Sequence, residues 1–228
     1  AGLTIGKGAM ERPLRSLVRA VESSGIEVRT DVAPSVEDIV ALDPSTVIVA
    51  TGSRPLIPPI PGLEEPLTAE EVLTGKRIPG ARVLILGGGL VGIEMADQLA
   101  GEDHEVVVVE LLEDIARDME AITRKMTLKR LEALPVTIHT TTRLLRMNGS
   151  EAIVRIGEEE AETSLGSFDS VIVAVGHRPD DPISEAIRKA GLEVAVVGDA
   201  RAPGQIWDAT QSARDTVWEL SGRGRNTD

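Results

Sequence analysis

The chain has 228 residues, with 37 acidic and 24 basic side chains, and its formal net charge is −13. It contains no cysteine and three histidines, which excludes disulfides, thiolate-bound clusters and cysteine nucleophiles and argues against a metal site. The acidic balance, with one phenylalanine and two tryptophans, disfavours nucleic-acid binding. No apolar run approaches the roughly 20 residues of a membrane span, and no secretory leader is visible. We therefore expect a cytoplasmic protein without a membrane partner.

The first third of the sequence predicts two helices, a strand and a linker. Apolar residues spaced by three and four predict a helix over 13–23, and Ser35 can cap a short helix. The β-branched run over 46–50 is typical of a strand that is buried on both faces of a parallel sheet. An extended linker follows, because prolines cannot lie inside a helix: Pro55, Pro58, Pro59 and Pro61.

The central part alternates strands with helices. Thr68 can cap a short helix through its spacing to Glu71. Buried strands are expected over 82–86 and 105–109, and helices over 90–100 and 122–134. This alternation predicts parallel βαβ units in a Rossmann-like α/β fold.

A different pattern follows from 136 to 175, where only strands are predicted. Asn148 and Gly149 supply the residues of a tight hairpin turn, so a three-stranded antiparallel excursion is the simplest arrangement. The chain then closes with a helix over 183–190, a strand over 194–197 and a helix over 206–220.

An internal repeat indicates the domain organisation. Residues 46–55 read TVIVATGSRP and residues 170–179 read SVIVAVGHRP, so both strands end in Gly-x-Arg-Pro. We expect the chain to leave one domain at the first copy and to return to it at the second. The predicted domains are a partial FAD-type domain over 1–65 and 177–228, and an NAD(H)-binding domain inserted over 66–176.

A glycine motif of the form G-x-G-x-x-G follows the predicted strand over 82–86 and opens the next helix. Its first glycine permits a tight turn, its second lets a pyrophosphate approach the backbone, and its third lets the helix pack on the strand. The helix amino terminus would bind the phosphates. A purely structural turn is the alternative. The expected cofactor-binding residues here are Gly87, Gly88, Gly89, Leu90, Val91 and Gly92.

Glu110 lies 18 residues after Gly92, at the end of the second buried strand. A carboxylate there can accept hydrogen bonds from the hydroxyls of an adenosine ribose, and it would repel a ribose phosphate. The next two residues are leucines, and the first arginine that could receive a phosphate is Arg117. We therefore expect NAD rather than NADP, although Glu110 could also be an ordinary strand-end acid.

Taken together, the segments ATG (50–52), GGGLVGIE (87–94), AVGHRP (174–179) and VVGDA (196–200) resemble the flavin-dependent pyridine-nucleotide oxidoreductases. In that family an NAD(P) domain is inserted into an FAD domain. The resemblance implies that Glu94 approaches the nicotinamide side, with a solvated helix acid as the alternative. It also implies that Asp199, otherwise a loop acid, contacts the flavin. The other flavin-side or crossover residues that it implies are Thr51, Gly52, Gly176 and Gly198.

The segments over 68–76 and 108–125 are similar to the C-terminal half of multidomain NADH:flavin oxidoreductases of the old yellow enzyme type, the group of dienoyl-CoA reductase and trimethylamine dehydrogenase. Three features of that group are absent from this sequence: the FAD glycine motif, the FMN barrel and the iron–sulfur cysteines. Residue 1 is Ala. We therefore expect a fragment of a longer polypeptide, with the FMN barrel domain as an upstream partner.

These observations predict an NAD(H)-binding module of a flavin-dependent oxidoreductase, in which hydride passes between NADH and FAD. The alternative is a non-catalytic dinucleotide-binding or docking module. No residue qualifies as catalytic, because the cofactors carry the chemistry. The parent would be an enzyme, and activity of this chain alone is left open. His177 could transfer protons, but a loop role is favoured. An exposed sheet edge could drive oligomerisation.

Overall fold

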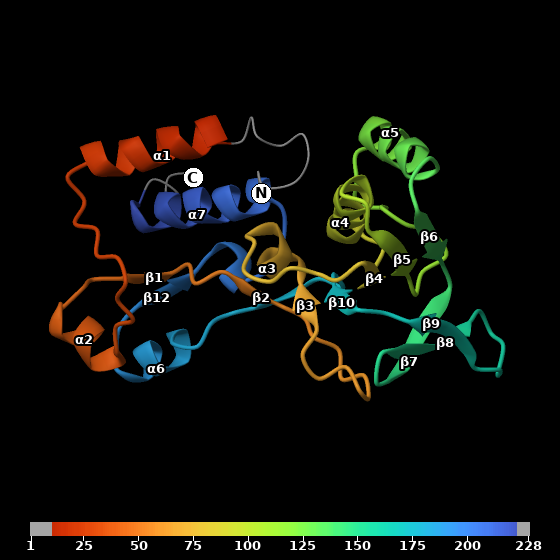
Figure 1. The fold of residues 1–228 in the computed structure, drawn as a ribbon. Helices are drawn as coiled ribbons and strands as arrows, with labels where there is room; N and C mark the ends of the chain where they lie inside the picture. Colours follow the sequence, from red (N-terminus) through yellow and green to blue (C-terminus); the bar gives the residue numbers. More distant parts are fainter. Residues whose placement is uncertain (1–10, 223–228) are drawn as a thin grey trace, which may run out of the picture. The chain divides into compact units, whose positions relative to one another are not determined.

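A computed structural model describes residues 11–222 and divides the chain into two units (Figure 1). Among the described residues, unit 1 contains 11–26 and 55–175, and unit 2 contains 27–54 and 176–222. The chain passes from unit 2 to unit 1 after Arg54 and returns after Val175. Both passages fall within the repeated strand-Gly-x-Arg-Pro segments.

Unit 1 is built on a parallel five-stranded sheet with the order β3-β10-β4-β5-β6. Its middle strands are runs of β-branched and aliphatic residues, which suit a sheet covered on both faces. The predicted α/β fold with a parallel sheet is confirmed. The strands are β3 (Leu67–Thr68), β4 (Arg82–Leu86), β5 (Glu105–Val109), β6 (Val136–His139) and β10 (Ser170–Val173); the helices of unit 1 are α1 (Glu11–Ser23), α3 (Ala69–Leu73), α4 (Leu90–Gly101) and α5 (Ala121–Leu131).

The two faces of this sheet contribute to two separate cores. Successive side chains of a strand point to opposite faces, so Val83 and Ile85 of β4 pack with α3, α4 and α5 in what we call the helix-side core, whereas Leu84 and Leu86 belong to the second core. In the second core the sheet packs against the antiparallel strands. Each of these four side chains is at most 8% exposed. The sheet therefore provides a rigid base for the loops at its carboxyl edge.

The three-stranded antiparallel excursion predicted over 136–175 is present as β7 (Thr142–Asn148), β8 (Glu151–Ile156) and β9 (Thr163–Ser167). Asn148 ends β7, and Gly149 adopts a positive φ of 62° in the turn that leads to β8. A left-handed backbone conformation of this kind favours glycine. The sequence signal for the hairpin was therefore the turn residue itself.

Helix α5 ends at Leu131, three residues before the predicted end of that helix. Residues 132–134 continue as turns, in which Ala133 N–H donates to the carbonyl of Arg130 and Leu134 N–H to that of Leu131. Pro135 follows, and a proline disfavours helical backbone in the residue before it. The boundary is thus a local effect that helical periodicity could not indicate.

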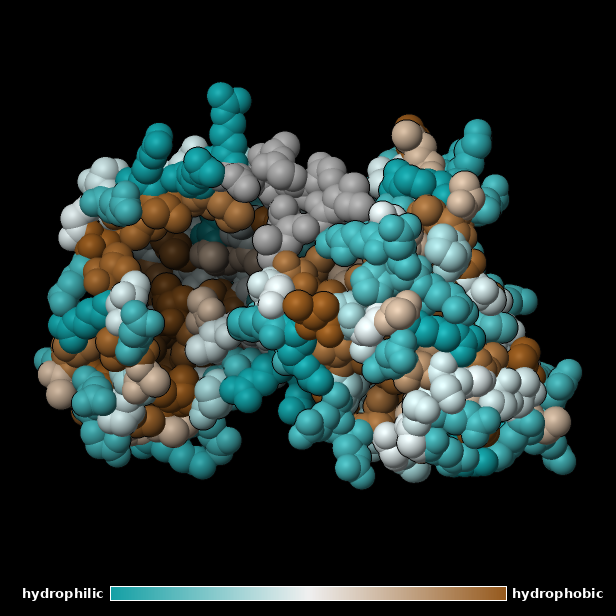
Figure 2. All heavy atoms as spheres, in the orientation of Figure 1, coloured by the Kyte–Doolittle hydropathy of each residue, from teal (hydrophilic) through white to brown (hydrophobic). Residues whose placement is uncertain are grey.

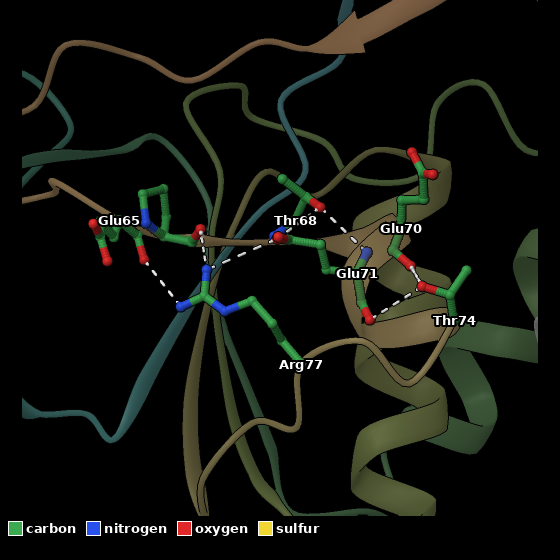
Figure 3. A network of polar contacts seen from close by, with 7 residues as sticks. Glu65, Thr68, Glu70, Glu71, Thr74 and Arg77 are labelled. Atoms are coloured by element: carbon green, nitrogen blue, oxygen red, sulfur yellow. Dashed lines mark hydrogen bonds and ion pairs between the residues drawn. The ribbon is translucent and has the colours of Figure 1, made fainter. Parts of the chain in front are cut away.

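A polar network secures the entry into α3 (Figure 3). Thr68 and Glu71 form the predicted capping box: Glu71 N–H donates to Thr68 Oγ1 (3.2 Å) and Thr68 N–H donates to Glu71 Oε2 (2.9 Å). The second bond holds the pKa of the Glu71 carboxyl below its ordinary value. Arg77 donates to the carbonyl oxygens of Pro66 (3.3 Å) and Glu65 (3.4 Å). The network therefore joins the helix start to the segment before β3.

Unit 2 has two small sheets, β1 (Val47–Val49) beside β12 (Val194–Val196) and β2 (Ser53–Pro55) beside β11 (His177–Pro179). The last residue of β2, Pro55, already belongs to unit 1. The first pair is parallel. The second pair brings together the Arg-Pro ends of the repeat, and Arg54 Nε lies 2.8 Å from Asp180 Oδ2 beside it. The helices are α2 (Val36–Ala41), α6 (Ser184–Lys189), α7 (Ile206–Leu220) and the 3₁₀ turn η2 (Gly198–Ala200).

The prediction that the strand over 46–50 is buried on both faces is wrong. Ile48 in the centre of β1 is 45% exposed, and only Val49 is fully buried in this strand. Within the described part of unit 2, β1 has a single neighbouring strand, β12. Figure 2 shows hydrophobic residues at the surface over the elements of unit 2. Among the described residues, this β-branched run therefore forms a strand whose central side chain is exposed.

No helix among the described residues is both long and apolar enough to cross a membrane.

Candidate dinucleotide site

The turn between β4 and α4 requires glycine at its first position. Gly87 has a φ of 109°, which side-chain-bearing residues rarely adopt. A Cβ atom on Gly87 would also lie 2.5 Å from the carbonyl oxygen of Ala174 in the neighbouring segment. Gly87 N–H donates to the carbonyl of Val109 (2.9 Å), which joins the turn to the end of β5.

The third glycine of the motif lets α4 pack against this turn. A Cβ atom on Gly92 would lie 1.9 Å from the carbonyl oxygen of Gly87, so no other residue fits without moving the backbone. Gly89 differs, because the nearest atoms to its hypothetical Cβ are the carboxylate oxygens of Asp118 at 3.9 Å. The backbone is therefore accessible at Gly89, where α4 begins.

Glu110 directly contacts the glycine turn. Its Oε2 accepts a hydrogen bond from Gly88 N–H (2.6 Å) and its Oε1 accepts one from Leu112 N–H (2.8 Å). Two backbone donors thus orient the carboxylate at the end of β5. Each carboxylate oxygen has a further lone pair, so the group can still accept hydrogen bonds from ligand hydroxyls.

A cavity of about 470 Å³ opens beside these residues. It combines the backbone of the turn with three carboxylates and one guanidinium. Arg117 forms no hydrogen bond or ion pair with the described residues, so its charge is available to the cavity. The lining residues are Gly88, Gly89, Glu110, Leu112, Asp114, Ala116, Arg117 and Asp118.

The sequence prediction missed Asp118, whose Oδ1 accepts a hydrogen bond from the backbone N–H of Leu90 at the start of α4 (2.9 Å). Asp118 belongs to no part of the glycine motif, and only the folding of the segment after β5 brings it there. Arg117, considered in sequence only as a distant phosphate ligand, lines the same cavity as Glu110.

The remaining predicted residues of α4 have different environments. Leu90 packs its side chain against the helix-side core, so it can act on a ligand only through its backbone. Val91 is 37% exposed, and Glu94 is half-buried. The structure therefore brings Glu110 and Gly92 into contact with the turn formed by Gly87, Gly88 and Gly89. Leu90, Val91 and Glu94 lie on α4, which follows the turn.

The residues predicted to face the flavin form a second group, within unit 2. Thr51 Oγ1 donates to the carbonyl of Asp180, and the carbonyl of Gly52 accepts from Asp180 N–H (3.0 Å). Asp199 Oδ2 accepts from Ser53 Oγ (3.1 Å), one residue after Gly52. Gly198 N–H donates a hydrogen bond to Ser212 Oγ (3.1 Å). Gly176, with a φ of 103°, directly precedes β11, which begins with the exposed residue His177.

Over residues 17–202 the chain matches the family model of the pyridine nucleotide-disulphide oxidoreductases. It is 35% identical over 207 residues to the NADH oxidase of Thermoanaerobacter brockii, a match that covers 86% of this chain and 31% of that protein. It is 34% identical over 195 residues to the bilirubin reductase of Mediterraneibacter gnavus, with coverages of 85% and 30%. The chain thus spans about a third of the length of these relatives.

Solved structures share the fold. Histamine dehydrogenase from Rhizobium sp. 4-9 superposes with a TM-score of 0.84 at 19% identity, over 100% of this chain and 38% of that one. 2-Naphthoyl-CoA reductase superposes with a TM-score of 0.82 at 21% identity, over 92% of this chain and 32% of that one. The predicted resemblance is confirmed at the level of the family. With a match over residues 17–202, the chain belongs to the pyridine nucleotide-disulphide oxidoreductase family.

Proposed function

We propose that this chain is the NAD(H)-binding module of a flavin-dependent oxidoreductase, in which hydride passes between NADH and FAD. The observation that carries the proposal is the glycine turn at the carboxyl ends of β4 and β5. There Glu110 accepts a hydrogen bond from Gly88, and both residues line one cavity. Such a turn provides an accessible backbone for a pyrophosphate and a carboxylate for a ribose.

The residues of unit 1 fit a dinucleotide. Glycines at positions 87 and 92 allow a turn that a Cβ atom would block, and Gly89 leaves the start of α4 accessible. In the proposal, the backbone from Gly89 to Val91 holds the pyrophosphate, Glu110 accepts from the ribose hydroxyls, and Glu94 lies toward the nicotinamide. The bound nicotinamide would supply the hydride chemistry.

The charges lining the cavity favour NAD over NADP. Three carboxylates, those of Glu110, Asp114 and Asp118, face one guanidinium, that of Arg117. Asp114 also pairs with Arg124. The additional phosphate of NADP would bring further negative charge beside Glu110, where like charges repel. Arg117 is the single cavity residue that could offset this repulsion.

Unit 2 would contribute only part of a flavin site. Thr51, Gly52, Gly176, Gly198 and Asp199 are the proposed flavin-side residues. The sequence before β1 has no glycine motif like that at 87–92, so the flavin pyrophosphate needs additional chain. We therefore propose that the chain is part of a longer NADH:flavin oxidoreductase with an FMN barrel domain. The cytoplasmic location also remains a prediction.

Isothermal titration calorimetry with NADH and NADPH tests the nucleotide part of this proposal. We expect NADH to bind at least tenfold more tightly than NADPH. The variant Glu110→Ala should weaken NADH binding about tenfold, since a charge-assisted hydrogen bond contributes roughly 1.5–3 kcal/mol. Glu113→Gln is the matched control, because Glu113 is an exposed acid of the same segment and does not line the cavity. Absence of NADH binding, or equal affinity for NADPH, would contradict the proposal.

A non-catalytic docking module is the second candidate, and the hydrophobic residues exposed in unit 2 favour it. Trp207 and Trp218 of α7 are 68% and 53% exposed, and Ile48 is 45% exposed. Apolar exposure of this kind marks surfaces that bind a partner. Adding FAD and an artificial electron acceptor separates the candidates: NADH-dependent reduction of the acceptor supports the oxidoreductase. NADH binding without flavin binding or reduction supports the docking module.

A further inference from the structure

The amino terminus of α4 already has an anionic hydrogen-bond acceptor. Gly89 is the N-cap residue of this helix and has no side chain that could cap it. Asp118, from the segment after β5, supplies the acceptor instead: its Oδ1 lies 2.9 Å from the backbone nitrogen of Leu90. Backbone amides at a helix amino terminus are the donors that bind phosphate groups. Asp118 therefore occupies a donor that a dinucleotide would need.

The segment that carries Asp118 is held firmly by its neighbours. Ala116 is fully buried with a positive φ of 50°, and its N–H donates to the carbonyl of Gly88 (2.7 Å). Ile115 and Met119 are 9% and 7% exposed and belong to the helix-side core. The backbone on both sides of Asp118 is thus anchored, while its side chain remains exposed. A rotation of this side chain can release Leu90 N–H without moving the segment.

A ligand phosphate and the Asp118 carboxylate compete for the same place. Both are anions that accept from the same N–H, and their charges repel one another in the cavity. Inorganic phosphate gains only the helix amides if it displaces Asp118. A dinucleotide also gains contacts with Glu110 and the rest of the cavity. These contacts can offset the free-energy cost of displacing Asp118 from Leu90 N–H.

We propose that Asp118 is a specificity-determining residue of the dinucleotide site: its carboxylate holds the phosphate position at the start of α4 and must be displaced by the ligand pyrophosphate. This inference rests on the proposed function of unit 1. Asp118 lowers the affinity for every phosphate-bearing ligand, and only ligands with further contacts bind in spite of it. Adenosine, which has no phosphate, is unaffected by Asp118.

The variant Asp118→Asn separates charge from structure. Asparagine retains an oxygen acceptor for Leu90 N–H and caps helices about as well as aspartate, so the fold should persist without the negative charge. Asp118→Ala removes both the acceptor and the charge. Glu113→Gln is again the control, because it removes one negative charge from the same segment without touching the site.

Calorimetric titration of the whole chain with NADH, ADP-ribose and adenosine tests the inference. Asp118→Asn should bind NADH and ADP-ribose about tenfold more tightly, which corresponds to about 1.4 kcal/mol, and should leave adenosine affinity unchanged. Glu113→Gln should leave all three affinities within about twofold of the unsubstituted chain. Asp118→Ala should show a similar gain for NADH and ADP-ribose.

Two results would overturn the inference. Unchanged or weaker NADH and ADP-ribose binding in Asp118→Asn would mean that the carboxylate does not compete with the pyrophosphate. An equal gain in Glu113→Gln would mean that only the overall charge matters. In both cases the proposed function stands, provided that the unsubstituted chain binds NADH. Absence of NADH binding in the unsubstituted chain and in every variant would instead overturn both proposals.

Discussion

Units 1 and 2 contain similar strand sequences in very different surroundings. In unit 1, β4 lies between two parallel neighbours, and its residues from Val83 to Leu86 are at most 8% exposed. In unit 2, β1 pairs only with β12 among the described residues, and Ile48 is 45% exposed. The glycine turn thus follows a strand that is buried throughout from Val83 to Leu86, whereas the residues proposed to face a flavin follow a strand that, among the described residues, is partly exposed. The two proposed sites therefore rest on parts of the chain that differ in burial.

Spectroscopy can distinguish unit 2 from the chain as a whole. Both tryptophans lie in α7 of unit 2, and the chain has no tyrosine. Tryptophan fluorescence therefore reports on unit 2, while far-UV circular dichroism reports on the helices and strands of both units.

The largest expected effect comes from substituting matched isoleucines in the two units. Ile85→Ala in β4 should lower the free energy of unfolding by about 2–5 kcal/mol, because it leaves a cavity in a core where Ile85 is 0% exposed. Ile48→Ala in β1 should cost less than about 1 kcal/mol. Urea unfolding followed by circular dichroism measures both. Equal losses would show that the units are equally well packed and would break the comparison.

The next effect concerns the glycine turn. Gly92→Ala should cost about 3 kcal/mol and abolish measurable NADH binding, since the added methyl would lie 1.9 Å from the Gly87 carbonyl oxygen. Gly101→Ala is the control in the same helix: a Cβ atom there meets no atom within 4 Å, and alanine is the better helix former. That control should retain NADH binding with unchanged or slightly higher stability. Normal NADH binding by Gly92→Ala would refute the assignment of the turn.

A smaller effect is expected from the ion pair between α4 and α5. Arg130 Nε donates to Asp97 Oδ1 (2.7 Å), and the side chain of Asp97 is 6% exposed. Arg130→Ala should cost about 2 kcal/mol, because it leaves a buried carboxylate without its partner. Lys189→Ala, which removes an exposed pair with Glu185 in α6 of unit 2, should cost less than about 0.5 kcal/mol. A similar melting-temperature shift in both variants would contradict this difference.

The smallest effect should appear as a change with pH in unit 1. The hydrogen bond from Thr68 N–H lowers the pKa of the Glu71 carboxyl in the folded state. The stabilisation that the ionised Glu71 carboxylate gives the folded state is therefore complete above its unfolded-state pKa of about 4.3. This stabilisation is lost as the pH falls through the lower pKa of Glu71 in the folded state. Glu71→Gln should make stability less dependent on pH in this window, which urea titrations at several acidic pH values can measure. An unchanged dependence would exclude this role of Glu71.

Local signals in the sequence predicted most of the elements. Continuous apolar runs predicted β4 and β5, the glycine motif predicted the start of α4, and the turn residues Asn148 and Gly149 predicted the hairpin of the antiparallel sheet. The glycine motif with Glu110 predicted a turn and a carboxylate that the structure brings into contact. These features could be predicted because each depends on residues close in sequence or on a pattern with a fixed geometry.

The sequence by itself determined the α/β class, the glycine turn and the repeated Gly-x-Arg-Pro segments, because chain stereochemistry and alternating burial leave a direct trace in residue order. Only the tertiary structure decided that Ile48 is exposed and that Asp118 caps α4. Exposure depends on which layers cover a strand, and a long-range cap depends on how a distant segment folds back. Neither feature is a property of the local sequence, so the hydrogen bond from Leu90 N–H to Asp118 appeared only in the folded chain.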